Sequence, residues 1–275
     1  MHALVDGDEI IYRAGFSSER NIYYAVDGDM FHRYRYKKEA DDSGYEKIIT
    51  RKEIDSEEIA IANLINVVHT YLSGFDYDDY TIYLGKGDNF RDDIATIQPY
   101  KGDREESKKP IHYSLLKDYL VSKYIIEYTE GMESDDGMSI AQWTRWCQGL
   151  KRDSCIVTQD KDLNMVPGWH HNPVKNEKFF IEEDEAMKTF YKQMLTGDST
   201  DNIPGMFKLT GNKATAKIKN KIDKMDDEID MYNLVLTCYE GDVNMVEEIG
   251  NLLWMKKEKD KPYTPGERHY GVYDS

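Results

Sequence analysis

Four short apolar segments, separated by longer stretches of helical character, constrain what this chain can fold into. They are ALV (3–5), YTIYL (80–84), YIIEY (124–128) and SCIVT (154–158). Amphipathic helical patterns lie between them, at about 56–72, 113–124 and 134–147. Strands that alternate with helices predict an α/β fold with a mostly parallel central sheet covered by helices.

Two further regions depart from this alternation. The segment 21–38 has two aromatic-rich alternating runs around Asp27-Gly28, which predicts a β-hairpin inserted into the α/β region. From Glu183 to about residue 255 the pattern is helical, and 256–275 is polar and broken by prolines. We therefore expect an α/β domain over 1–182, a helical region over 183–255 and a loosely held tail.

Composition limits the function classes. The 275 residues include 52 acids and 36 bases, for a net charge of −16, which by itself favours a soluble protein without a polyanionic partner. Three cysteines without CxxC spacing indicate a reducing compartment and no zinc ribbon. The start of the chain has no signal-peptide pattern, and no apolar run approaches the roughly 18 residues that span a bilayer. We expect a soluble, intracellular protein.

Acidic side chains follow the predicted strands. Because the carboxyl ends of parallel strands meet at one edge of a sheet, acids there come together. A further acidic segment, LTGDSTDNIPG (195–205), follows a predicted helix. The candidate acids are Asp6, Glu133, Asp135, Asp136, Asp160, Asp162, Asp198 and Asp201.

Each acid alone has an ordinary explanation as a helix cap, a turn former or a solvated loop residue. Their convergence at one place has no such ordinary explanation. Two carboxylates about 4 Å apart repel by roughly 4 kcal/mol at an effective dielectric constant near 20. Such a cluster needs protonation or bound cations. With no His or Cys among the candidates, the cations would be hard ones, Mg²⁺ or Mn²⁺.

The ordered set of Asp6, GMESDD, TQDKDL and LTGDSTDNIPG resembles the 5′-nuclease superfamily, especially the free-standing 5′→3′ exonucleases of tailed bacteriophages. PYKGDREESKKP resembles the base of that family's arch, here about 98–123, and GMFKLTGNKATAKI resembles its helix-hairpin-helix DNA-binding element. The resemblance covers some four-fifths of the chain. It implies the PIN-like 5′-nuclease fold with a helix-hairpin-helix region after it.

The resemblance also implies roles for individual residues. Asp6, Glu133, Asp135 and Asp136 match acids around a first metal ion, and Asp160, Asp162, Asp198 and Asp201 match those around a second. Lys101 and Arg104 match a catalytic basic pair at the scissile phosphate, and Tyr100 matches an aromatic residue that stacks on the terminal base. The other implied DNA contacts are Arg91, Lys108, Lys109, Gly205, Lys208, Gly211, Lys213 and Lys217.

The chain departs from the family pattern at the end of the second strand. An acid is usual there, but this chain has Gly85 and Lys86, and Asp88 is a candidate replacement. The arch segment also looks short. The hairpin 21–38 has no obvious counterpart, and its residues Tyr23, His32, Arg33, Tyr34 and Arg35 either touch single-stranded DNA or form an ordinary edge hairpin.

The implied function is a metal-dependent 5′→3′ exonuclease with flap, nick and gap endonuclease activity, which leaves 5′-phosphates by a two-metal mechanism. The implied ligands are two Mg²⁺ or Mn²⁺, a K⁺ at the helix-hairpin-helix element, and DNA with 5′ ends or an RNA·DNA hybrid. We expect a phage-encoded monomer, working with replication proteins in the host cytoplasm.

Two other classes compete with this reading. One is a haloacid-dehalogenase-type phosphatase with Asp6 as nucleophile, although its late acidic motif should follow a strand. The other is a catalytically silent DNA-structure-binding protein of the same fold; a PIN-type RNA nuclease is a related alternative.

Overall fold

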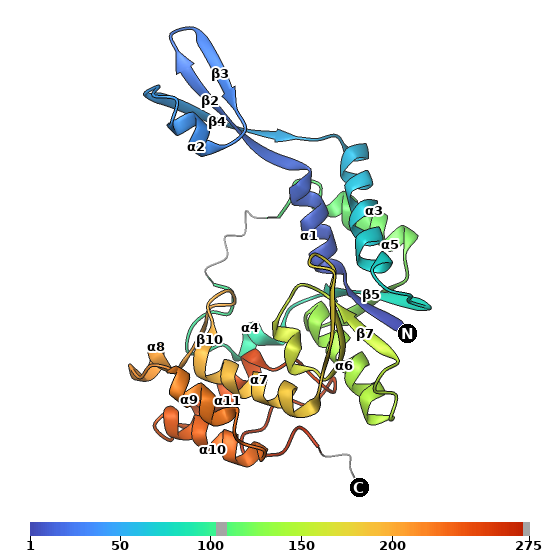
Figure 1. The fold of residues 1–275 in the computed structure, drawn as a ribbon, viewed down its shortest axis with the longest axis vertical. Helices are drawn as coiled ribbons and strands as arrows, with labels where there is room; N and C mark the ends of the chain where they lie inside the picture. Colours follow the sequence, from blue (N-terminus) through green and yellow to red (C-terminus); the bar gives the residue numbers. More distant parts are fainter. Residues whose placement is uncertain (103–108, 272–275) are drawn as a thin grey trace. The chain divides into compact units, whose positions relative to one another are not determined.

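The computed structural model describes residues 1–102 and 109–271, and its contacts divide the chain into two compact units (Figure 1). The sheet unit comprises 1–8, 71–106 and 125–275, and the hairpin unit comprises 9–70 and 107–124. Within the described residues, no helix combines the length and apolar character that crossing a bilayer requires.

The sheet unit is built on a six-stranded sheet in the order β6-β5-β1-β7-β8-β9. Its strands are β1 (His2–Asp6), β5 (Asp79–Lys86), β6 (Ile126–Glu130), β7 (Ser154–Val157), β8 (Gly168–Asn172) and β9 (Glu177–Ile181). All neighbours are parallel except the edge pair β8 and β9. The mostly parallel sheet was predicted, whereas β8 and β9 were not. Strand β1 is buried along Ala3, Leu4 and Val5, as expected for a central strand covered on both faces.

The helices of the sheet unit complete the core. Helix α6 packs on β1, β5, β6 and β7, and α7 contacts η2 and four of the later helices. The bounds are α4 (Phe90–Ile94), α6 (Ser134–Cys147), η2 (Asp162–Met165), α7 (Glu183–Thr196), α8 (Met206–Thr210), α9 (Ala216–Ile222), α10 (Glu228–Cys238) and α11 (Val243–Leu253). Two short strands, β10 (Gly197–Asp198) and β11 (Ile203–Pro204), form a separate antiparallel pair.

The hairpin unit contains a three-stranded antiparallel sheet in the order β3-β2-β4. The strands β2 (Glu19–Asp27) and β3 (Met30–Tyr34) are the predicted hairpin, and Gly28 has the left-handed backbone that its turn needs (φ 58°). Strand β4 (Lys47–Ile54) was not predicted. The helices are α1 (Gly7–Ser17), α2 (Lys37–Asp41), α3 (Glu57–Ser73) and α5 (Tyr113–Lys123).

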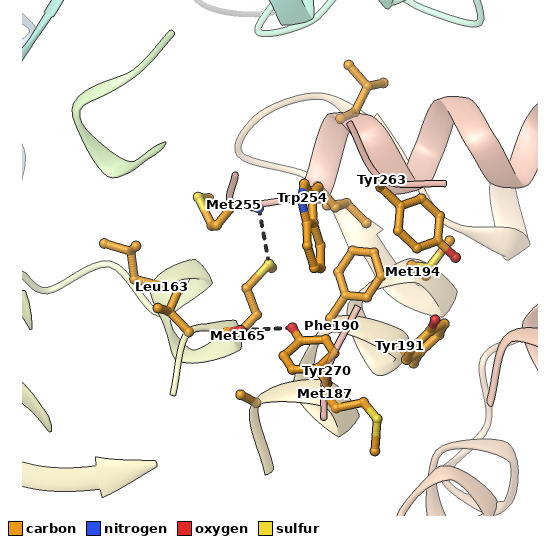
Figure 2. Packing of buried hydrophobic residues seen from close by; sticks show 14 of the residues in the cluster. Leu163, Met165, Met187, Phe190, Tyr191, Met194, Trp254, Met255, Tyr263 and Tyr270 are labelled. Carbon is orange, nitrogen blue, oxygen red and sulfur yellow. Dashed lines mark hydrogen bonds between the residues drawn. The ribbon is translucent and has the colours of Figure 1, made fainter. Parts of the chain in front are cut away.

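The expectation of a loosely held tail is wrong for the residues after α11. Figure 2 shows Trp254, Tyr263 and Tyr270 packed with Phe190 of α7, and all three aromatic rings from this segment are at most 5 % exposed. The phenol of Tyr270 donates a hydrogen bond to the carbonyl of Met165 at 2.9 Å. Aromatic rings of this size each remove roughly 150–250 Å² from water. Two of these rings, Tyr263 and Tyr270, belong to the expected tail 256–275, whose polar composition gave no sign of their burial.

Candidate active site

The acidic segments meet at the carboxyl edge of the parallel sheet. Asp6, the last residue of β1, is 7 % exposed. Its two carboxylate oxygens accept hydrogen bonds from Ser134 Oγ at 3.3 Å and Thr158 Oγ1 at 3.4 Å. Ser134 opens α6 and Thr158 directly follows β7, so the topology brings the ends of two strands and the start of one helix to Asp6.

Asp135, in the first turn of α6, lies at the centre of these acids. Its Oδ1 atom is buried and has no hydrogen-bond partner among the described residues. Burial raises the pKa of Asp135 well above its ordinary value, and the negative charges of Asp6, Asp160 and Glu133 raise it further. A buried carboxylate without a partner is costly, so this position favours a proton or a cation.

A second group of acids lies at the start of η2. Burial, and then the charges of Asp160 and Asp198, raise the pKa of Asp162 to about 8. Asp162 Oδ1 accepts a hydrogen bond from Gln193 Nε2 of α7 at 2.7 Å, and its backbone N–H donates to Asp160 Oδ1 at 2.8 Å. The charge of Asp160 raises the pKa of both Asp135 and Asp162, so the two groups of acids interact electrostatically.

Tyr100 and Lys101 join Glu133 to Asp201. The phenol of Tyr100 contacts Asp201 Oδ2 at 2.8 Å and Glu133 Oε2 at 3.2 Å, and Lys101 Nζ forms ion pairs with the same two carboxylates. Lys101 has a left-handed backbone (φ 51°), and its N–H donates to the Asp201 carbonyl at 2.9 Å. Such strain is typical of functional positions. Glu133 and Asp201, expected around different metal ions, are therefore neighbours.

Tyr100 is only 7 % exposed. A nucleotide base can stack on its ring only after the side chain has left this position. Its hydroxyl is also occupied by the two acids, so the stacking role stays a prediction that requires a rearrangement of the side chain on binding.

The expected roles of Asp136 and Arg91 are wrong in this structure. Arg91 donates two hydrogen bonds to Asp136, at 2.6 and 2.9 Å, and the two side chains are 1 % and 0 % exposed. Arg91 also donates to the carbonyls of Leu252 and Trp254, at 2.9 and 2.7 Å. Asp136 already has a buried cation, so it is not free to bind a metal ion, and Arg91 does not reach a surface where DNA could lie.

Sequence reasoning missed Asp8. Its Oδ2 accepts a hydrogen bond from the backbone N–H of Gly85 at 3.0 Å, and a Cβ added at Gly85 would lie 3.4 Å from the same oxygen. Asp8 therefore places a carboxylate beside the strand end where the family pattern has an acid. Asp88, the candidate replacement, is exposed in the turn after β5. The sequence Asp6-Gly7-Asp8 at the end of β1 is the feature that could have indicated Asp8 as a site residue.

The donor set fits hard divalent cations that keep part of their water. Across residues 1–102 and 109–271, no three acidic, His or Cys side chains are arranged closely enough to enclose a metal ion. Mg²⁺ commonly binds one or two carboxylates and retains several waters, so it does not require such a cage. The buried, unpartnered Asp135 Oδ1 and the purely carboxylate donors are consistent with this type of binding.

The expected DNA contacts divide into exposed and buried positions. Lys109, Lys208, Lys213 and Lys217 are exposed, whereas Arg104 and Lys108 lie outside the described residues. Gly205 is buried, and a Cβ there would lie 2.2 Å from the Thr196 carbonyl oxygen. The glycine allows two backbone segments to approach closely, and the burial of Gly205 contradicts a DNA contact there.

The turn after α8 also differs from the expectation. Gly211 has a left-handed backbone (φ 77°) and ends α8, and its N–H donates to the Phe207 carbonyl at 3.0 Å. That N–H is therefore not available to a phosphate. Helix α9 begins at Ala216, with Thr215 as its N-cap.

Comparisons with known protein sequences match only part of the chain. No family model matches the chain. A DNA polymerase I from Rhizobium leguminosarum is 32% identical over 107 residues, which are 36% of this chain and only 10% of that protein. The matched segment is thus a small part of the polymerase's length.

Solved structures match nearly the whole chain. A bacteriophage T5 protein co-crystallised with metal ions has a TM-score of 0.58 at 13% identity, with 92% of this chain and 89% of that chain covered. The T5 flap endonuclease in a pseudo-enzyme-product complex with DNA and metal ions has a TM-score of 0.56 at 12% identity, with 90% and 87% covered. A zinc-bound T5 5′-exonuclease has a TM-score of 0.51 at 13% identity, with 92% and 89% covered.

At these identities the likeness shows the fold. The mostly parallel sheet, the acids that follow its strands and the helical region after it were predicted from the sequence motifs. This chain has the fold of the T5 5′-exonuclease and flap endonuclease structures, as its resemblance to the 5′-nuclease superfamily predicts.

Proposed function

We propose that this protein is a divalent-metal-dependent 5′→3′ exonuclease that also cleaves DNA flaps, nicks and gaps, and leaves 5′-phosphates. The observation that supports the proposal most directly is the position of Asp135. Its buried oxygen has no hydrogen-bond partner in the part of the chain that the structure describes and lies within the electrostatic influence of Asp6, Asp160 and Glu133, which come from separate segments of the chain. Only a positive charge or protonation makes that convergence tolerable.

Each acidic group would have a distinct part in the reaction. Asp6, Glu133 and Asp135 would hold one ion, and Asp160, Asp162, Asp198 and Asp201 would hold another, as the resemblance implies. Two divalent ions would supply a water of lowered pKa and would neutralise charge on the phosphate. The acids themselves keep the ions at a fixed edge of a rigid sheet, which orients the phosphodiester for attack.

Lys101 would have two states. In this structure its ammonium group pairs with Glu133 and Asp201. If divalent ions neutralised these carboxylates, the ammonium group would be free to contact the scissile phosphate. Arg104 would assist it, as the resemblance implies. The exposed Lys208, Lys213 and Lys217 would contact the backbone of the uncleaved duplex.

The finer parts of the proposal follow from the family resemblance. We propose Mg²⁺ or Mn²⁺ as the divalent ion, K⁺ at the turn between α8 and α9, and action on RNA·DNA hybrids during primer removal. The protein would act as a monomer in the cytoplasm of a phage-infected cell. The T5 flap endonuclease complex contains DNA and metal ions, which supports this assignment of ligands.

The phosphatase alternative loses support from the position of Asp198. That acid follows helix α7 and lies outside the six-stranded sheet, whereas the phosphatase motif should follow a strand of the sheet.

The test is a cleavage assay with 5′-labelled flap, nicked and blunt duplexes in Mg²⁺ or in EDTA. We expect cleavage in Mg²⁺ only, and its loss in Asp135→Asn. The matched control is Asp184→Asn, which removes the same charge from a side chain that is 64% exposed on α7. Cleavage that persists in EDTA, or is unchanged in Asp135→Asn, contradicts the proposal. A flap with an RNA 5′ segment tests the hybrid substrate in the same assay.

A further inference from the structure

The strand register gives the three-stranded sheet of the hairpin unit two different faces. Residues opposite one another in an antiparallel pair lie on the same face. Tyr24 pairs with Arg33 and with Ile49, and Ile22 pairs with Arg51. The same face continues through Val26, which pairs with Phe31 and Lys47. We call this the Tyr24 face; its members are Arg20, Ile22, Tyr24, Val26, Phe31, Arg33, Lys47, Ile49, Arg51 and Glu53.

The opposite face is covered by the connection between β3 and β4. Helix α2 packs on β2 and β3, and both Ala40 of α2 and Ala25 of β2 are fully buried. Tyr45 stacks on His32 with ring centroids 5.0 Å apart, and its hydroxyl contacts the His32 ring at 3.3 Å. Ala25 and His32 are paired on this covered face. The Tyr24 face is thus the one that this connection leaves open.

The Tyr24 face is basic in a strongly acidic protein. It has four bases, Arg20, Arg33, Lys47 and Arg51, against one acid, Glu53, whereas the whole chain has a net charge of −16. Arg20 and Arg33 both pair with Glu53, at 3.3 and 3.1 Å, and Arg20 also reaches Asp55 at 2.8 Å beyond the strand. Lys47 and Arg51 are exposed. The charge of this face therefore suits a polyanion.

Aromatic rings are interleaved with these bases. Phe31 is 55% exposed, and the Arg51 guanidinium lies 5.5 Å from the centre of the Tyr24 ring. Ile22, a member of the same face, is only 1% exposed. A surface with an exposed aromatic ring and neighbouring guanidinium groups matches the two recognition elements of single-stranded nucleic acid, stacked bases and phosphates.

We propose that the Tyr24 face binds single-stranded nucleic acid, with bases stacked on Phe31 and phosphates held by Arg51, Arg33 and Lys47. A duplex is a poorer match, because its base faces are already stacked on one another. An acidic protein segment would satisfy the charges but would leave Phe31 unused. This inference goes beyond the proposed nuclease function and does not depend on the acidic site.

The experiment measures fluorescence anisotropy of labelled dT20 with the full chain in EDTA, where no metal-dependent cleavage occurs. We expect about a tenfold weaker affinity for Phe31→Ala, from the loss of one stacked base. For Arg51→Ala, we expect weaker binding and a salt slope smaller by about 0.7, the contribution of one phosphate contact. Melting curves establish that each variant is folded.

Two neighbouring residues supply matched controls. Met30 is 60% exposed and lies next to Phe31, but it pairs with Asp27 on the opposite face. Lys52 is next to Arg51 and pairs with Asn21 on that same opposite face. Met30→Ala and Lys52→Ala should bind dT20 within twofold of the parent protein. Equal losses in the variants of both faces would overturn the proposal.

A conservative variant separates stacking from folding. In Phe31→Trp we expect affinity at least equal to that of the parent, together with a decrease in Trp fluorescence, relative to the parent, when dT20 is added. Unchanged affinity in Phe31→Ala with no such decrease in Phe31→Trp would overturn the proposal. It would also be overturned if poly-glutamate bound as tightly as dT20 and with the same dependence on Arg51 only, which would indicate an acidic protein partner.

Discussion

Asp135 and Asp136 are consecutive residues in the first turn of α6, yet their environments are opposite. Asp136 is fully buried against Arg91, which supplies two hydrogen bonds and an internal positive charge. Asp135 has a buried oxygen with no hydrogen-bond partner among the described residues, and the charges of three other acids act on it. Asp136 has its counter-ion within the fold, whereas the position of Asp135 favours a proton or a cation. Two acids that are adjacent in sequence therefore differ because of the positive charges around them.

The largest expected effect is the loss of nuclease activity when Asp135 is replaced. Asp135→Asn should lower the rate of flap cleavage by about 10³-fold, or roughly 4 kcal/mol, because it removes an acid from the cation site. The folded protein without metal should be at least as stable as the parent, since a repelled charge is lost. Cleavage rates and thermal melting in EDTA measure the two effects. A variant that loses activity only because it unfolds would contradict the comparison.

Arg91→Met should act mainly on stability. Removing one partner of a buried ion pair leaves Asp136 as an uncompensated buried charge, which costs about 3–5 kcal/mol. Urea denaturation measures this loss of unfolding free energy. The double variant Arg91→Met/Asp136→Leu, which removes both charges, should recover most of it. If the double variant is no more stable than Arg91→Met, the pair does not behave as a self-contained unit.

Replacing Asp8 should have a smaller effect, on the dependence of the cleavage rate on Mg²⁺ concentration. Asp8→Asn should lower activity about 10- to 100-fold at limiting Mg²⁺, because it removes the carboxylate beside the end of β5. Adding Gly85→Asp to this variant should restore part of the activity, since a Cβ at Gly85 meets its neighbours at 3.4 Å or more. The measurement is the cleavage rate as a function of Mg²⁺ concentration. Identical curves for parent and Asp8→Asn would exclude a role for Asp8.

The smallest effect concerns pH. The pKa of Asp162 is raised to about 8 in the fold, mainly by burial, so the folded state keeps a proton that the unfolded chain loses near pH 4. Stability of the metal-free protein should therefore fall as pH rises from about 4 to about 8. Melting temperatures in EDTA should decrease by a few degrees over this range, and less in Asp162→Asn or with Mn²⁺ present. Equal slopes for parent and variant would remove Asp162 as the cause.

Local patterns predicted the elements that depend on nearby residues. The apolar segments predicted β1, β5, β6 and β7, and the strand ends indicated where the acids of three segments meet, whereas the fourth acidic segment follows a helix. Contacts between distant residues were not predictable in this way. Arg91 is tied to Asp136 and to carbonyls more than 150 positions away, and Asp8 substitutes in space for an acid expected on another strand. Sequence spacing says which segments come together, but it does not say which side chains pair.

The hydrogen bonds from Arg91 to the carbonyls of Leu252 and Trp254 have a consequence for synthesis of the protein. A nascent chain that has not yet left the ribosome beyond these positions has Arg91 and Asp136 but lacks the main-chain acceptors that lock the guanidinium group in place. The hydrogen bonds that hold Arg91 against Asp136 at the start of α6 would therefore be complete only after α11 and Trp254 have been translated.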